Sequence, residues 1–197
     1  MSGPLRALPD DAGPVLLAAA RAAIAGELGV PGPPPPVWPG WADAVLGTFV
    51  TLTQGGELRG CIGTLVEHRP LREGLAANAV RAARHDPRFP PLTAAELART
   101  RVEVSVLSDA EPMAVTSEDE ALAALRPGID GVIFAARGRQ ATFLPQVWDE
   151  LSDPRTFLAH LRRKAGLSAD CWGPDVRLSR YTVQAWEEPG PTGDGPS

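Results

Sequence analysis

The segment GTFVTLTQGGELRGCIGTL, residues 47–65, has the pattern of a β-hairpin. Residues 47–53 form one run rich in β-branched and aromatic side chains, and residues 57–65 form a second run. Gln54-Gly55-Gly56 lies between them and provides the glycines that tight hairpin turns favour. The segment therefore predicts two antiparallel strands joined by a short turn.

Outward from this hairpin, the hydrophobic spacing predicts helices and further strands. The expected helices are residues 14–28, 70–84, 92–98 and 118–125, and a last one that begins after Asp153 and ends at Gly166. The expected strands are residues 101–107, 131–136, 140–144 and 176–186. The alternation in the last strand changes phase near Arg180, which indicates a bulge or kink.

Strands that come in adjacent pairs, with helices between the pairs, predict an α+β fold. We expect a largely antiparallel mixed sheet flanked by helices, with one large lobe and one small lobe around residues 112–139. We expect residues 12–188 to form the domain and residues 1–11 and 189–197 to be flexible.

Composition narrows the class of protein. The chain has 197 residues and a formal net charge of −5, which argues against a nucleic-acid-binding surface. It contains neither a basic leader followed by an apolar stretch nor an apolar run of about 18 residues, so we expect a cytoplasmic protein that does not span a membrane. Two distant cysteines and three scattered histidines, His68, His85 and His160, form no metal-ligand pattern, and no motif identifies a cofactor.

The motif LRGCIGT, residues 58–64, is the strongest candidate for chemistry. Alternation along a strand places Arg59, Cys61 and Gly63 on one face, and Gly60 and Thr64 on the other. An arginine beside a cysteine favours the thiolate, and glycines allow a backbone or a ligand to come close. Two interpretations stay open: Cys61 is a reactive thiol, or it is a small buried side chain that serves packing.

Further candidates lie outside this motif. The loop DPRFPP, residues 86–91, holds Asp86 and Arg88 in fixed directions, either to bind an anionic group or to tie the loop to its neighbours. Asn78 lies at the edge of an apolar helix face, either exposed or paired with a buried polar group. Glu103 is a candidate carboxylate on its strand, and Gln146 follows a strand end where backbone N–H groups are free to bind a ligand.

Several segments, in order along the chain, resemble the AMMECR domain family, called AmmeMemoRadiSam system protein A in microbes. The segments are ELRGCIGTL, the helix around Asn78, DPRFPPL, VEVSVL, GIDGVIF, TFLPQVW and FLAHLRRKAGL. The resemblance covers roughly residues 12–188. It implies a mixed fold with a large and a small lobe and a cleft near the LRGCIG strand. It also implies association with a Memo-type protein, similar to extradiol dioxygenases, and with a radical S-adenosylmethionine enzyme.

Two hypotheses about function follow. In the first, the protein is a thiol-based enzyme or an accessory subunit in a modification pathway. Cys61 is then the nucleophile or acyl carrier, Arg59 activates it or binds an anionic group, Arg88 positions the substrate, and Glu103 acts as acid or base. In the second, the protein is a non-catalytic scaffold whose LRGCIG cleft recognises a segment of a partner protein.

Overall fold

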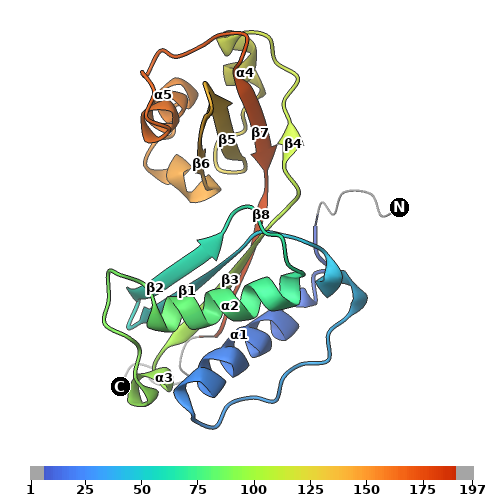
Figure 1. The fold of residues 1–197 in the computed structure, drawn as a ribbon, viewed down its shortest axis with the longest axis vertical. Coiled ribbons are helices and arrows are strands. Elements are labelled where there is room, and N and C mark those ends of the chain that lie inside the picture. Colours follow the sequence, from blue (N-terminus) through green and yellow to red (C-terminus); the bar gives the residue numbers. More distant parts are fainter. Residues whose placement is uncertain (1–6, 190–197) are drawn as a thin grey trace, which may run out of the picture. The chain divides into compact units, whose positions relative to one another are not determined.

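The computed structural model describes residues 7–189, which form two compact units. Unit 1 contains the residues up to Leu107 together with those from Gln184 onward, and unit 2 contains Ser108–Val183. Figure 1 shows the helices and strands of both units. Unit 2 is larger than the small lobe expected at residues 112–139, because the last long helix and the strand after it belong to it.

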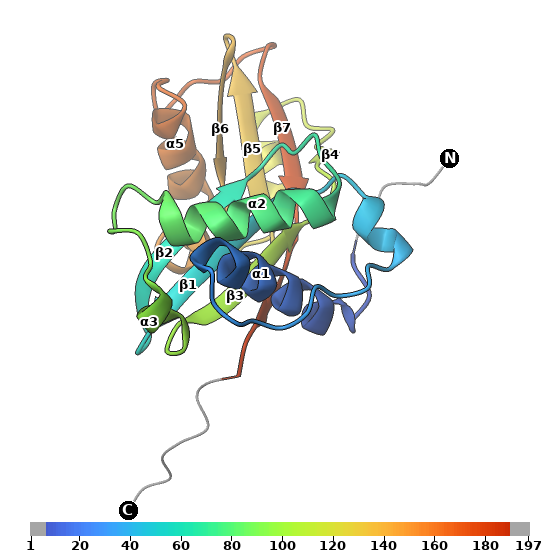
Figure 2. The ribbon, with the colours of Figure 1, turned by 60° about the horizontal axis from the view of Figure 1, so that its bottom comes forward.

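Unit 1 is a four-stranded antiparallel sheet with its two long helices on one face (Figures 1 and 2). The strand order is β2-β1-β3-β8, so β2 is an edge strand. The strands are β1 Thr48–Gln54, β2 Glu57–Thr64, β3 Arg101–Leu107 and β8 Val183–Glu187. The helices are α1 Ala12–Leu28, η1 Gly40–Asp43, α2 Leu71–Arg84 and α3 Ala94–Leu97.

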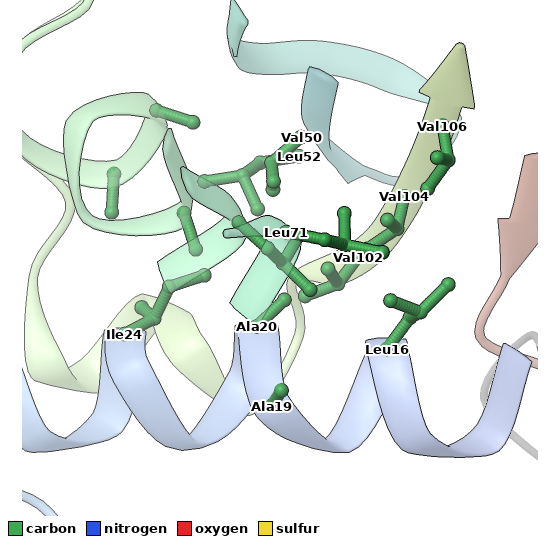
Figure 3. Packing of buried hydrophobic residues seen from close by; sticks show 14 of the residues in the cluster. Leu16, Ala19, Ala20, Ile24, Val50, Leu52, Leu71, Val102, Val104 and Val106 are labelled. Carbon is green, nitrogen blue, oxygen red and sulfur yellow. The ribbon is translucent and has the colours of Figure 1, made fainter. Parts of the chain in front are cut away.

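The core of unit 1 lies between this sheet and the two long helices. Figure 3 shows Leu16, Ala20 and Ile24 of α1 in the same cluster as the alternate valines of β3. The buried side chains of the sheet on this side are Val50, Leu52, Val102, Val104 and Val106. We call the opposite side of the sheet its polar face, defined by Thr51, Cys61 and Glu103.

Unit 2 contains a second four-stranded sheet, ordered β4-β7-β5-β6. Its elements are β4 Glu111–Pro112, α4 Glu118–Ala124, β5 Gly131–Ala136, β6 Arg139–Phe143, η2 Pro145–Asp149, α5 Pro154–Lys164 and β7 Arg177–Tyr181. Trp148 stacks on Phe157 of α5 with ring centroids 3.7 Å apart, and its indole N–H donates to the Asp130 carbonyl at 2.7 Å. This aromatic pair joins η2 to α5 in the core.

The α+β fold predicted from the sequence is confirmed, and the expected elements agree with the observed ones to within about three residues at their ends. The exception is the last strand. Its expected phase change is confirmed, but a single strand is wrong, because β7 and β8 belong to different sheets. Thr182 stands between them, where its N–H donates to Ser108 Oγ and its carbonyl accepts from the Ser108 N–H. The short β4 and η1 were not predicted.

The expected flexible termini fall mostly on residues 1–6 and 190–197, which lie outside the described residues. Leu8 is described: it is buried in the core of unit 1, and its backbone N–H donates to the Gln184 side chain at 2.6 Å. Between residues 7 and 189, no helix has both the length and the apolar character needed to cross a bilayer.

Candidate functional site

The LRGCIGT strand, β2, alternates as its sequence predicts. Gly60, Ile62 and Thr64 face the helical side of the sheet, while Cys61 and Gly63 lie on the polar face opposite Thr51 and Phe49 of β1. Because β2 is an edge strand, one side of its backbone pairs with β1 and the other side is left for loops. The site is therefore a strand edge as well as a sheet face.

The two glycines of the motif are explained by close packing. A Cβ atom on Gly60 would lie 2.3 Å from the Ala82 carbonyl oxygen of α2. A Cβ atom on Gly63 would lie 2.1 Å from the Phe49 ring. The expectation that another backbone approaches the motif closely is met at Gly60 by α2, and at Gly63 the space is taken by an aromatic ring.

Arg59 lies where the register between β1 and β2 shifts, so the simple alternation of the strand is interrupted there. Its guanidinium donates to both carboxylate oxygens of Glu96 at 3.0 and 3.3 Å, and to the Pro90 carbonyl at 3.0 Å. The hydrogen bond from Arg59 is the main reason that the pKa of Glu96 falls to about 2, and bonds from Thr93 add to the effect. Arg59 therefore ties β2 to α3 and to the loop before it.

The DPRFPP loop binds the outer edge of β2 at Cys61. Asp86 is buried, and its carboxylate accepts the Cys61 N–H at 2.8 Å. Arg88 donates to the Cys61 carbonyl at 3.1 Å and, through Nε and Nη2, to the Asp86 carboxylate at 3.0 and 2.7 Å. At this residue the Asp86 carboxylate and the Arg88 guanidinium take the hydrogen bonds that a neighbouring strand would otherwise make. The N–H and the C=O of Cys61 are therefore both satisfied.

These contacts also shift the pKa values of the two charged groups next to Cys61. The hydrogen bond from Arg88 holds the pKa of Asp86 well below its usual range, and the Cys61 N–H contributes. In turn, the hydrogen bond to Asp86 is the main reason that the pKa of the Arg88 guanidinium is raised, and the nearby Cys61 side chain adds to that rise. The sequence pattern pointed to Arg59 as the cation beside the thiol, but the guanidinium that interacts with the Cys61 side chain is that of Arg88.

A row of polar side chains crosses the polar face at Cys61. Thr51 of β1 lies opposite Cys61 of β2 on one side and Glu103 of β3 on the other. The Thr51 hydroxyl donates to the Cys61 sulfur at 3.4 Å. Burial, and next the charge of Glu187 on β8, raise the pKa of Glu103. The fold therefore brings together a thiol, a hydroxyl and a carboxyl group whose pKa is raised. Two strand spacings, about 10 Å, separate Cys61 on β2 from Glu103 on β3.

Asn78 and Thr64 serve the fold rather than the polar face. Asn78 is completely buried, and its amide N–H groups donate to the carbonyl and hydroxyl oxygens of Thr48 at 3.1 and 2.9 Å. Its carbonyl oxygen accepts from the Thr64 hydroxyl at 3.2 Å. Of the two alternatives for Asn78, the structure shows the buried, paired one: this amide joins α2 to β1 and β2.

The remaining candidates lie elsewhere. Gln146 is an exposed residue of η2 in unit 2. His68, His85 and His160 are exposed, and none of them is a hydrogen-bond partner of Cys61 in the described part of the chain. Within residues 7–189, no group of three or more histidine, cysteine, aspartate or glutamate side chains is placed to hold a metal ion.

Sequence reasoning missed Thr51, Glu96 and Glu187. Thr51 and Glu187 occupy ordinary positions of strands, and only the strand order places them in the row with Cys61 and Glu103. Glu96 carried a detectable signal: Thr93-Ala94-Ala95-Glu96 is a helix capping box, and the structure shows its reciprocal hydrogen bonds. What the signal did not show is that the same carboxylate binds Arg59.

Comparison with known proteins agrees with this architecture. A protein of Methanothermobacter thermautotrophicus is 42% identical over 146 residues, which cover 73% of this chain and 76% of that protein. Protein MJ0810 of Methanocaldococcus jannaschii is 41% identical over 140 residues, 70% of each chain. The crystal structure of uncharacterized protein PH0010 from Pyrococcus horikoshii matches 95% of this chain and 96% of its own, with a TM-score of 0.79 and 35% identity. The model of the AMMECR1 family matches residues 17–186, and the chain therefore belongs to the AMMECR1 family.

Proposed function

We propose that Cys61 is the reactive thiol of an enzyme, or of an accessory subunit, in a modification pathway. The partners in this proposal are a Memo-type protein and a radical S-adenosylmethionine enzyme, and the pathway is cytoplasmic. The observation that carries the proposal is the environment of Cys61. Its backbone is fixed by Asp86 and Arg88, and its sulfur accepts a hydrogen bond from Thr51. A residue that only fills space needs neither a charged anchor nor a donor at its sulfur.

The same contacts suit a nucleophile. The Thr51 hydroxyl donates to the Cys61 sulfur, and the Arg88 guanidinium donates to the carbonyl of the same residue, so two donors surround the nucleophile. The thiolate attacks an electrophilic carbon of the substrate, such as an acyl carbon, and a carbon–sulfur bond forms. The leaving group departs with the electrons of its broken bond and takes up the proton that the thiol released.

Glu103 fits a role on the substrate rather than on the thiol. At about 10 Å from Cys61 across the sheet, it is too far to take the thiol proton directly. Burial and Glu187 raise the pKa of Glu103, so this carboxyl keeps its proton to a higher pH than an exposed glutamate does. We therefore assign to Glu103 the protonation of a substrate group that lies over Thr51.

A scaffold function is the second candidate, and one observation favours it. Two of the large apolar side chains that stay exposed lie near the ends of the edge strand β2. Leu58 lies in its first residues and is 42% exposed, and Val66 lies just after its end and is 56% exposed. Exposed apolar residues beside a strand edge are typical of surfaces that bind an extended partner segment. Copurification with a Memo-type or radical enzyme that survives Cys61→Ser but is lost in Leu58→Asp would support this function over the first.

The thiol proposal is tested by the rate of Cys61 alkylation. Cys171 is buried in unit 2, and a Cys171→Ser background leaves one thiol to follow. We expect iodoacetamide to modify Cys61 in the folded protein faster than in the urea-unfolded protein at pH 7, and Thr51→Val to slow the folded-state reaction several-fold. A Cys61 that reacts only after unfolding would make it a packing residue and reject the proposal.

A further inference from the structure

Arg88 has a guanidinium nitrogen that the fold does not use. Its Nε and Nη2 donate to Asp86 and to the Cys61 carbonyl. Its Nη1 donates to no partner among the residues that the structure describes, and the side chain is 53% exposed. A guanidinium group that is hydrogen-bonded through one of its edges and exposed at the other can bind a second anion from solution.

The position of this open nitrogen is fixed. Asp86 holds the guanidinium from one side, and the Phe89 ring lies with its centroid 5.5 Å from the Arg88 guanidinium carbon. Pro87 stiffens the backbone between Asp86 and Arg88. A flexible surface arginine would lose side-chain entropy on binding an anion, but much of that loss has already occurred here.

The guanidinium that carries the open nitrogen lies against Cys61. Nη2 of the same planar group touches the backbone of Cys61, and the Cys61 side chain interacts with the guanidinium. On the opposite part of the polar face, the charge of Glu187 is paired with Arg101 at 3.1 Å, and the pKa of Glu103 is raised. A ligand that approaches Cys61 therefore meets an open guanidinium nitrogen on the side of the strand edge, whereas the Arg101 guanidinium on the side of β3 and β8 is paired with a carboxylate.

We propose that Arg88 is the anion-recognition residue of the Cys61 site, held in place by Asp86, so that the thiol takes an electrophile that carries a negative charge. This inference rests on the proposed thiol function and names the class of its substrate. Arg59 has no such role, because all three of its guanidinium nitrogens donate to Glu96 and Pro90.

The test compares two methanethiosulfonate reagents of similar size, one with an ethylsulfonate group and one with an ethyltrimethylammonium group. In both, the thiolate attacks the sulfenyl sulfur, a disulfide forms, and methanesulfinate leaves with the electron pair of the broken S–S bond. The measured quantity is the rate of Cys61 modification by the anionic reagent divided by the rate with the cationic reagent, both in the Cys171→Ser background. The same ratio in urea-unfolded protein gives the reference value.

We expect the folded protein to favour the anionic reagent about threefold over the reference, because the paired Asp86 carboxylate and the solvent offset part of the Arg88 charge. Arg88→Gln should return the ratio to the reference, while the matched control Arg59→Gln should keep it. The wild-type preference should also shrink at 0.5 M salt, a measurement that needs no variant to fold. Equal rates for the two reagents, or a preference that Arg59→Gln removes as fully as Arg88→Gln, would overturn the inference.

The two proposals fail in different ways. If Cys61 reacts readily but shows no charge preference, the thiol function stands and the role of Arg88 is rejected. If Cys61 reacts with neither reagent until the protein unfolds, the thiol function itself is rejected, and the anion site is rejected with it.

Discussion

Replacing Gly60 by alanine tests whether the motif glycine is there for packing or for a ligand. The added Cβ atom would lie 2.3 Å from the Ala82 carbonyl oxygen and 3.3 Å from its carbon. Carbon and oxygen atoms normally stay about 3.3 Å apart or more, so α2 or β2 must move by about 1 Å. The contact is with helix backbone, which has no rotamer by which to escape. Overpacking of this kind costs about 1–3 kcal/mol.

The assay is urea unfolding followed by far-ultraviolet circular dichroism. With a slope of about 2 kcal/mol per molar urea, a loss of 2 kcal/mol lowers the midpoint by about 1 M. Gly26→Ala is the matched control, because Gly26 is an exposed position of α1 where an added Cβ atom meets nothing within 4 Å. Alanine there should raise the free energy of unfolding by about 0.5–1 kcal/mol.

An unchanged midpoint for Gly60→Ala, with the expected rise for Gly26→Ala, would refute the reasoning. It would mean that α2 does not press on β2 at Gly60, and the glycine would then need another explanation, such as close approach of a ligand. A lowered midpoint with unchanged Cys61 alkylation in the remaining folded protein would show that Gly60 acts through packing alone.

Three further predictions concern buried or paired polar groups. Asn78→Leu removes three hydrogen bonds of a fully buried amide and should cost about 2–4 kcal/mol in urea unfolding, whereas Thr64→Val removes one of them and should cost about 1 kcal/mol. Glu96 has a folded-state pKa of about 2 against an ordinary 4.5, so wild-type stability should fall as the pH drops through that interval. In thermal melts, the melting temperature of Glu96→Gln should fall less steeply with falling pH than that of wild type. The pKa of Glu103 is raised above 4.5, so the folded protein is more stable with Glu103 protonated and loses this stability as the pH rises. Glu103→Gln should therefore have a higher melting temperature than wild type at pH 7 and the same melting temperature below pH 4.5. Equal melting temperatures at both pH values would contradict the burial of this carboxyl.

The elements were predictable because their signals are local. Asp153 was expected to begin the last helix, and its carboxylate accepts the Thr156 N–H at 2.8 Å. The glycines after Gln54 were expected to form a turn, and both have positive φ angles. Each of these signals lies within a few residues of the structure that it produces, so no knowledge of the whole fold was needed.

The division into two units was not predictable in the same way. A phase change near Arg180 indicated a break in the last strand, but a kink within one sheet and a crossing between two sheets give the same pattern of side chains. What separates β7 from β8 is a contact across more than 70 residues, between Thr182 and Ser108. Local patterns carry no information about such a partner.

The two arginines near Cys61 show why the site itself could not be derived from spacing. Alternation correctly placed Cys61 on the polar face, but it also assigned the charge beside the thiol to Arg59, two residues away. A register shift interrupts the alternation at Arg59, and a glutamate 37 residues later binds its guanidinium. Arg88, 27 residues after Cys61, reaches the Cys61 carbonyl because a proline-stiffened loop runs along the open edge of β2. The N–H and C=O groups at a strand edge need hydrogen-bond partners. At Cys61 the carboxylate of Asp86 is the acceptor and the guanidinium of Arg88 is the donor. The charged pair beside Cys61 therefore follows from the need to close a sheet edge, and any protein in which Asp86 and Arg88 keep that geometry should keep the pair as well.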